Sequence, residues 1–255
     1  MDEKSLVKKA FAKNSNAYIT SKTHANEKEL EKMIAWTAPN KEMVMLDIAT
    51  GGGHVAKQFS PHVKNVIATD LTPEMLQETR YHLINYTNIQ YVVVDAENLP
   101  FLDQTFDIVS CRIAAHHFPN PTKFIEETNR VLKPKGTFIF VDNISSEDNE
   151  LDLYVNELEK LRDPSHMRSL KVSEWKQIIS TYPLSIRKEQ LQKKILPFQD
   201  WVNRTVEDPK QKNAVESYLL DANTRVKAYF DVKQQKEQLL SFSIDEWMVM
   251  YQKGD

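Results

Sequence analysis

The sequence predicts an α/β fold in which a mostly parallel sheet carries helices on both faces. Apolar runs of strand length alternate with helical stretches between residues 43 and 141, a pattern typical of βαβ units. A glycine-rich turn joins the first of these runs to a helix. After residue 145 the alternation gives way to helical segments and two further apolar runs. We therefore expect seven strands, the last of them antiparallel, with helical insertions that cap the sheet.

The individual elements follow from local signals along the chain. Thr72, Pro73 and Glu74 combine an N-cap, a proline at the first helical position and an acid in the first turn, and Asn120-Pro121 repeats the signal. The run Lys133–Gly136 should end the second of these helices. The expected strands cover residues 43–48, 65–69, 90–94, 106–111, 137–141, 184–195 and 239–251, and the later helices cover 150–162, 173–180, 198–204 and 209–230.

The 255 residues are expected to form one domain, since α/β folds commonly reach this length as a single unit. Residues 1–30 should form a helical arm that either packs on the core or covers a ligand. Residues 40–145 should form a cofactor-binding core. Residues 146–255 should complete the sheet and supply the helical cap over a substrate.

The composition limits the partners. Hydrophobic residues make up 41% and charged residues 27%, as in ordinary globular domains. A net charge of -3 gives no reason to expect nucleic acid. With the single cysteine Cys111, a charged amino terminus and no run of about 18 apolar residues, we expect a cytoplasmic protein without stable membrane insertion, either a monomer or a homodimer.

The strongest local signal is the run of three glycines, Gly51 to Gly53. The whole chain has only five glycines, and these three follow a buried strand and precede a helix. Glycine lets the backbone approach a ligand closely, and amides at the start of the helix can face it. The run therefore predicts a Rossmann-like ligand-binding loop.

Three acids follow three successive strands of the predicted sheet. Asp47 precedes the glycine loop, Asp70 ends the second strand, and Asp95 follows the third. An acid about 20 residues beyond the loop is placed to bind ribose hydroxyls. Since Asp47 would repel a pyrophosphate but suits a sulfonium and an ammonium, the set favours a cationic nucleoside over NAD.

These motifs together resemble those of class I S-adenosylmethionine-dependent methyltransferases, most closely the ubiquinone/menaquinone-biosynthesis type and its bacterial relatives. The resemblance spans about residues 40 to 145, and its motifs are Met45–Gly53, Ala68–Leu76, Asp95–Phe101, Phe106–Val109 and Arg130–Gly136.

The resemblance implies S-adenosylmethionine as the cofactor and gives roles to single residues. Asp47 and the glycine loop would surround the methionine part, and Asp70 would hold the ribose. Ala49 stands where the family usually has its first glycine. The expected cofactor set is Asp47, Ala49, Gly51, Gly53, Asp70, Leu71, Asp95, Ala96 and Arg112.

The expected reaction is methyl transfer to a carbon or oxygen of a small acceptor, aromatic or quinol-like. Histidines after the fourth strand lie where α/β sheets bind ligands and have a pKa suited to a general base. We rank His117 first, then His116, and then His166 in the helical insertion.

No metal is expected. Asp142 and Asn143 could offer oxygen ligands after the fifth strand, but a hard cation needs more of them, and Arg112 stands at the end of the fourth strand.

Two alternatives stay open. Gly51, Gly53 and Ala56 also fit a dinucleotide-binding pattern, so an NAD(P)-dependent oxidoreductase is one of them. A non-catalytic nucleoside-binding module is the other.

Overall fold

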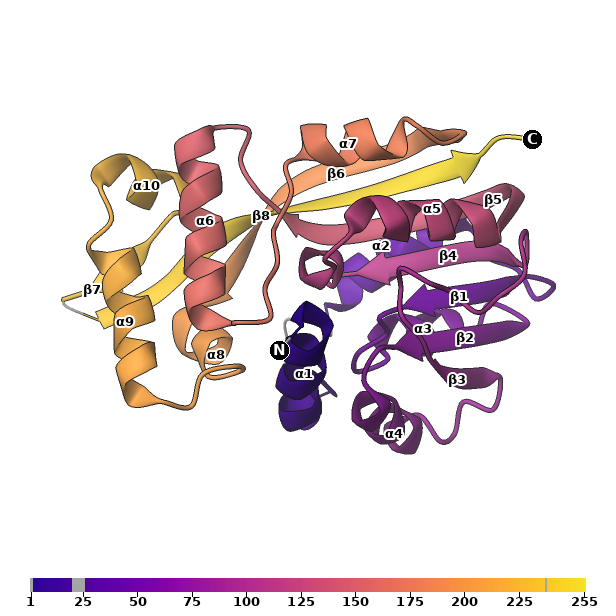
Figure 1. Cartoon of the computed structure of the whole chain (residues 1–255), viewed down its shortest axis with the longest axis horizontal. Helices are drawn as coiled ribbons and strands as arrows, with labels where there is room; N and C mark the ends of the chain where they lie inside the picture. The colour runs from indigo at the N-terminus through magenta and orange to yellow at the C-terminus, as the bar shows by residue number, and fades with distance from the viewer. Residues whose placement is uncertain (1, 20–25, 237) are drawn as a thin grey trace.

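The computed structural model describes residues 2–19, 26–236 and 238–255, and its strands form one eight-stranded sheet (Figure 1). The strand order is β3-β2-β1-β4-β5-β8-β6, with β7 paired to β8 beside this path. Five parallel strands make up its first part: β1 (Val44–Ile48), β2 (Asn65–Asp70), β3 (Ile89–Val93), β4 (Phe106–Arg112) and β5 (Leu132–Ile144).

The carboxyl-terminal strands complete the sheet. β8 (Gln238–Lys253) runs antiparallel to β5 on one side and to β6 (Leu184–Pro197) on the other. The predicted mostly parallel sheet with an antiparallel last strand is therefore confirmed. The expected count of seven was wrong by one, because the short β7 (Lys233–Gln235) forms a hairpin with the start of β8.

Helices lie along the sheet and form the cap. The described helices are α1 (Glu3–Ile19), α2 (Glu27–Thr37), α3 (His54–Phe59), α4 (Pro73–His82), η1 (Ala115–His117), α5 (Pro121–Val131), α6 (Asn149–Arg162), α7 (Val172–Ile179), α8 (Phe198–Val202), α9 (Pro209–Leu220) and α10 (Thr224–Tyr229). In these described residues no helix is long and apolar enough to cross a membrane.

Two expectations about elements need correction, and a third falls partly outside the described residues. The helix expected over 209–230 is two helices, because Asn223 caps a new start at α10 with its side chain. Lys133–Gly136 belongs to β5, since Leu132 already pairs with Phe106. The expected arm over residues 1–30 contains α1 and the start of α2, and its residues 1 and 20–25 lie outside the described part.

The core has three parts. Alternate residues of each parallel strand face opposite sides of the sheet, so Leu46 and Met45 enter two separate buried clusters. A third cluster joins α6, α8, α9 and α10 to the far ends of β6 and β8. Figure 1 shows these helices gathered at one end of the molecule, with α1 between them and the parallel strands.

Candidate active site

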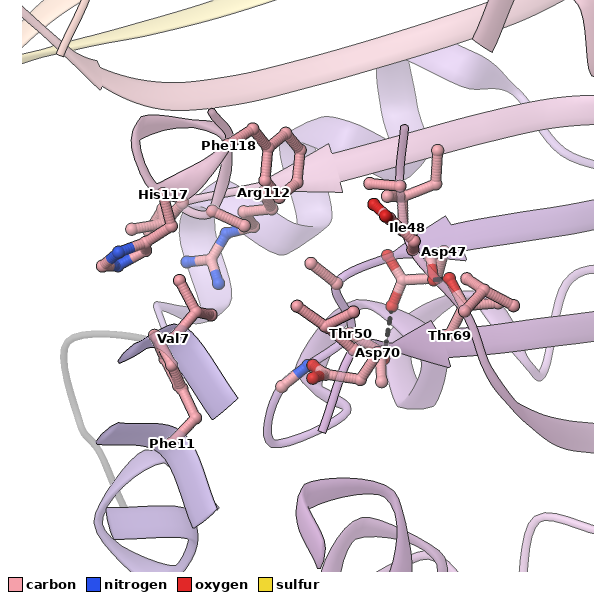
Figure 2. A pocket seen from close by; sticks show the side chains of 18 of the residues that line it. Val7, Phe11, Asp47, Ile48, Thr50, Thr69, Asp70, Arg112, His117 and Phe118 are labelled. Atoms are coloured by element: carbon pink, nitrogen blue, oxygen red, sulfur yellow. Dashed lines mark hydrogen bonds between the residues drawn. The ribbon is translucent and has the colours of Figure 1, made fainter. Parts of the chain in front are cut away.

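A large cavity lies at the carboxyl ends of β1, β2 and β4, and α1 forms part of its wall (Figure 2). Its volume is about 990 Å³, including its opening to solvent. Figure 2 shows Asp47 and Asp70 on one side of this cavity, and Arg112 and His117 on the other. Its position is the one at which open α/β sheets bind ligands.

Asp47 is a buried carboxylate at the end of β1, with 1% of its surface exposed. Ser110 Oγ and Thr50 Oγ1 each donate a hydrogen bond to it at 2.6 Å. Burial raises the pKa of Asp47 to about 6, although these two hydrogen bonds favour the ionised form. A cationic group in the cavity would therefore stabilise the charge that burial disfavours.

The glycine loop is held in shape by Asp70. The Asp70 carboxylate accepts hydrogen bonds from Gly51 N at 3.1 Å and from Thr72 N at 2.9 Å. Gly51 and Ala49 both have left-handed backbone, with φ of 50° and 53°. That conformation favours glycine, which explains the glycine that the family usually has at position 49.

Gly53 has a packing role rather than a place in the cavity wall. Its φ is 76°, and a Cβ there would lie 2.6 Å from Thr79 Cγ2 and 2.7 Å from Leu83 Cδ1. The missing side chain thus lets the start of α3 approach α4 closely.

Asp95, Leu71 and Ala96 line the part of the cavity next to β2 and β3. Lys4 Nζ of α1 lies 2.6 Å from Asp95 Oδ2 and 2.6 Å from Glu97 Oε2. These two ion pairs fasten α1 across the cavity. Nothing in the local sequence around Lys4 indicated this contact.

Arg112 reaches the cavity from the end of β4 and is paired with a buried acid. Its Nε donates to Glu29 Oε1 of α2 at 2.5 Å. Burial raises the pKa of Glu29 to about 7, and the positive charge of Arg112 acts against that rise. The sequence did not single out Glu29, which lies 83 residues from its partner.

A second cavity adjoins the first, and Phe11, Ile113 and His117 line both. Its volume is about 440 Å³, including its opening to solvent. His116 lines this second cavity, as do residues of β6, β8 and the helical cap. Ile113 has φ of 54°, which is strained for a β-branched residue and is typical of functional sites.

The two adjacent histidines have different partners. His116 Nδ1 lies 2.6 Å from Asp142 Oδ1, and burial, which lowers its pKa, is outweighed by this carboxylate, so the pKa is raised. His117 Nδ1 lies 3.1 Å from the Ser165 carbonyl. Burial and the neighbouring His116 lower the pKa of His117 to about 4. Since a carbonyl only accepts, this contact favours the tautomer in which Nδ1 of His117 carries the proton and Nε2 is the acceptor nitrogen.

His166 lies behind His116, with ring centroids 5.7 Å apart, and outside the walls of both cavities. Its Nε2 lies 3.0 Å from Asn156 Oδ1, and burial strongly lowers its pKa.

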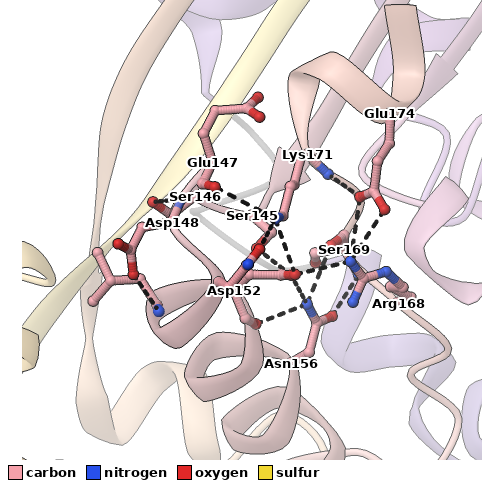
Figure 3. A network of polar contacts seen from close by, with 12 residues as sticks. Ser145, Ser146, Glu147, Asp148, Asp152, Asn156, Arg168, Ser169, Lys171 and Glu174 are labelled. Atoms are coloured by element: carbon pink, nitrogen blue, oxygen red, sulfur yellow. Dashed lines mark hydrogen bonds and ion pairs between the residues drawn. The ribbon is translucent and has the colours of Figure 1, made fainter. Parts of the chain in front are cut away.

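The loop that carries Ser165 and His166 is fixed by a polar network between α6 and α7 (Figure 3). Arg168 bridges Asp152 at 2.9 Å and Glu174 at 3.2 Å. Asn156 accepts a hydrogen bond from Ser169 N at 2.7 Å. Arg168 is thus held in this network by two acids.

The structure brings most of the expected cofactor residues around one cavity: Asp47, Ala49, Gly51, Asp70, Leu71, Asp95, Ala96 and Arg112 line it.

Comparison with known proteins defines the class. A family model described as a methyltransferase domain matches residues 46–140. A crystal structure of a protein from Bacillus halodurans superposes with a TM-score of 0.86 at 35% identity, covering 89% of this chain and 100% of that chain. The chain belongs to the class I methyltransferase family, which confirms the resemblance seen in the motifs.

Within that class, particular relatives are similar to this chain. The uncharacterized methyltransferase YcgJ of Bacillus subtilis is 36% identical over 239 residues, which cover 92% of this chain and 94% of the relative. The ubiquinone/menaquinone biosynthesis C-methyltransferase UbiE of Rickettsia typhi is 34% identical over 113 residues, which cover 41% of this chain and 46% of the relative. The similarity to UbiE is thus confined to part of each chain, whereas the similarity to YcgJ spans nearly all of both.

Proposed function

We propose that this methyltransferase binds S-adenosylmethionine in the large cavity and methylates a carbon or oxygen of a small acceptor in the second cavity. The observation that carries the proposal is the convergence of Asp47, Asp70 and Asp95 on one cavity at the ends of successive strands. Three carboxylates suit a ligand with a sulfonium, an ammonium and ribose hydroxyls.

The residues of the chain fit this cofactor part by part. Asp47, buried and with a raised pKa, would bind the ammonium of the methionine part. Asp70 would accept hydrogen bonds from the ribose while it holds Gly51 N. Leu71 and Ala96 would pack beside the adenine, and Asp95 would accept from its amine, next to the Lys4 ammonium.

The bound cofactor supplies a methyl group on a positively charged sulfur. Transfer forms a bond from the acceptor atom to the methyl carbon and breaks the carbon–sulfur bond, and the acceptor loses a proton. The chain contributes alignment and the exclusion of water, for which α1 covers the cavity with Val7 and Phe11.

His117 is the first candidate for the base that takes this proton, because it lines both cavities and its Nδ1 contact leaves Nε2 as the acceptor nitrogen. His116 is the second candidate, since Asp142 orients its ring in the second cavity. His166 would act only through its contact with His116, as a positioning residue. Asp142 contacts the His116 ring, so its carboxylate is not offered as a metal ligand. The reaction is proposed without a metal.

Calorimetric titration of S-adenosylhomocysteine into the wild type and Asp70→Ala tests the cofactor, with NAD as the competing ligand. Loss of charged hydrogen bonds should weaken binding of the homocysteine nucleoside by about 1.5 to 3 kcal/mol, roughly tenfold to a hundredfold. Asp221→Ala, at an exposed aspartate after α9, is the matched control and should bind as the wild type does. Binding of NAD alone, or of neither ligand, would overturn the proposal.

A further inference from the structure

Asp47 and Arg112 face each other across the large cavity, and both are buried. Figure 2 shows the Asp47 carboxylate on one side of this cavity and the Arg112 guanidinium on the other. Asp47 is 1% exposed and Arg112 is 9% exposed. The positive charge of Arg112 lowers the pKa of Asp47 against the larger effect of burial, so the two groups are close enough to interact. The cavity thus presents a carboxylate and a guanidinium on opposed walls.

The alternation of side chains along β4 explains where Arg112 lies. Ser110 and Arg112 are two residues apart in this strand, so their side chains lie on the same face of the sheet. Ser110 donates to Asp47 at 2.6 Å, and this face is therefore the one that carries Asp47. Because β4 ends at Arg112, the longer side chain reaches beyond Ser110 to the edge of the sheet at which the cavity lies.

A buried acid of α2 holds Arg112 in this place. Arg112 Nε donates to Glu29 Oε1 at 2.5 Å, and only 5% and 3% of the two side chains are exposed. A buried ion pair adds little net stability, and beside a cavity it is a candidate for a functional role. A guanidinium has five N–H donors in one plane, so Arg112 can contact Glu29 and bind the carboxylate of a ligand at the same time.

Other basic side chains that line the cavity are less suited to a carboxylate. Lys4 contacts both Asp95 and Glu97, at the part of the cavity assigned to the adenine. His117 has its pKa lowered to about 4, so its ring is neutral near pH 7. His54 lines the cavity at the start of α3, and its variant is therefore compared with that of Arg112 below.

We infer that Arg112 binds the carboxylate of an amino-acid group in the large cavity, and that Glu29 is the positioning residue for Arg112. An amino-acid group carries an ammonium and a carboxylate on one carbon, and the opposed Asp47 and Arg112 match this pair of charges. The inference deepens the proposed function and rests on it for the cofactor, whose methionine part carries this group. Arg112 would make the protein specific for a nucleoside with an intact amino-acid group.

The test is calorimetric titration of two nucleosides into the wild type. One is S-adenosylhomocysteine, and the other is its decarboxylated analogue, which has a hydrogen in place of the carboxylate and keeps the ammonium. We expect S-adenosylhomocysteine to bind at least about tenfold more tightly than the analogue. Equal affinities would overturn the inference and leave the cofactor proposal standing. If neither nucleoside binds, the proposed function fails, and the inference fails with it.

Arg112→Gln tests whether this side chain is the one that binds the carboxylate. The variant should weaken S-adenosylhomocysteine about tenfold and leave the analogue nearly unchanged, so the ratio of the two affinities should fall toward one. Arg80→Gln, at an exposed position of α4, is the matched control and should keep the ratio of the wild type. His54→Gln should also keep it. Loss of the ratio in His54→Gln and its retention in Arg112→Gln would overturn the assignment.

The positioning role of Glu29 is measured through the same ratio. Glu29→Ala removes the acceptor for Arg112 Nε and should lower the ratio about threefold or more. Glu29→Gln should retain it, because the amide oxygen can still accept from Nε. An equal loss of affinity for both nucleosides in Glu29→Ala would show that Glu29 supports the fold alone and does not position Arg112.

Discussion

At the scale of single residues, the site contains strained backbone conformations and a buried carboxylate, each of which costs stability. Ala49 and Ile113 both have positive φ, although neither is a glycine. Asp47 is a carboxylate buried at the end of a strand with its pKa raised. Such costs are typical of functional sites, where the surrounding structure sustains them.

Ala49→Gly should stabilise the protein. Alanine at positive φ costs about 1 to 2 kcal/mol, and the greater freedom of glycine in the unfolded chain offsets about half of the gain. We expect the free energy of unfolding in urea to rise by about 0.5 to 1 kcal/mol. Ala214→Gly, at an exposed position inside α9, is the control and should lower it by about 1 kcal/mol.

The affinity for S-adenosylhomocysteine should rise with pH because of Asp47. Burial raises its pKa to about 6 in the folded protein, above the ordinary value for an aspartate, so ionisation costs stability as the pH rises through about 6. An ammonium binds the ionised form, and we expect affinity about tenfold weaker at about pH 5 than above about pH 7. Calorimetry across this range checks it, and a flat profile would show that Asp47 does not contact the ligand.

At the scale of elements, the sequence predicted the strands and turns that depend on neighbouring residues, and it did not predict contacts between distant segments. The strands and the acids that follow them were predicted from apolar runs and from Gly and Pro, so the convergence of Asp47, Asp70 and Asp95 on one cavity could be foreseen. The contacts of α1 and α2 could not, because Lys4 meets Asp95 across 91 residues and Arg112 meets Glu29 across 83. The role of Gly53 was also missed, since its constraint comes from α4.

Gly53→Ala should destabilise the protein more than Gly51→Ala. Both glycines have positive φ, but a Cβ at Gly53 would overlap Thr79 and Leu83, whereas a Cβ at Gly51 meets nothing within 4 Å. We expect losses of about 2 to 3 kcal/mol for Gly53→Ala and about 1 kcal/mol for Gly51→Ala in urea unfolding. Equal losses would mean that α3 and α4 are not held together at Gly53.

At the scale of the whole molecule, β6 and β8 join the two halves of the site. β8 pairs with residues Thr137 to Ile144 of β5, and its other end enters the core of the cap with Leu239 and Phe242. Arg162, Lys194 and Arg204 line the second cavity from this part of the chain, which the sequence predicted to complete the sheet and to cap a substrate. Their convergence could not be read from the sequence, because it depends on how α6 and α8 pack on β6 and β8.

Binding of S-adenosylhomocysteine should slow amide hydrogen exchange in α1, because Lys4, Val7 and Phe11 line the cavity. We expect slower exchange over residues 3–12 on saturation, measured by mass spectrometry, since closed contacts reduce local opening. α9, at the cap end in Figure 1, should be unchanged. Equal protection of both helices would indicate a global effect instead.

The side chain of Phe11 is part of the wall of both cavities, and its ring lies 5.0 Å from that of His117. In the proposed function, nucleoside and acceptor would both contact this side chain, so we expect the binding of one to change the affinity for the other. Such coupling is reciprocal. If bound nucleoside increases the affinity for the acceptor by some factor, bound acceptor increases the affinity for the nucleoside by the same factor.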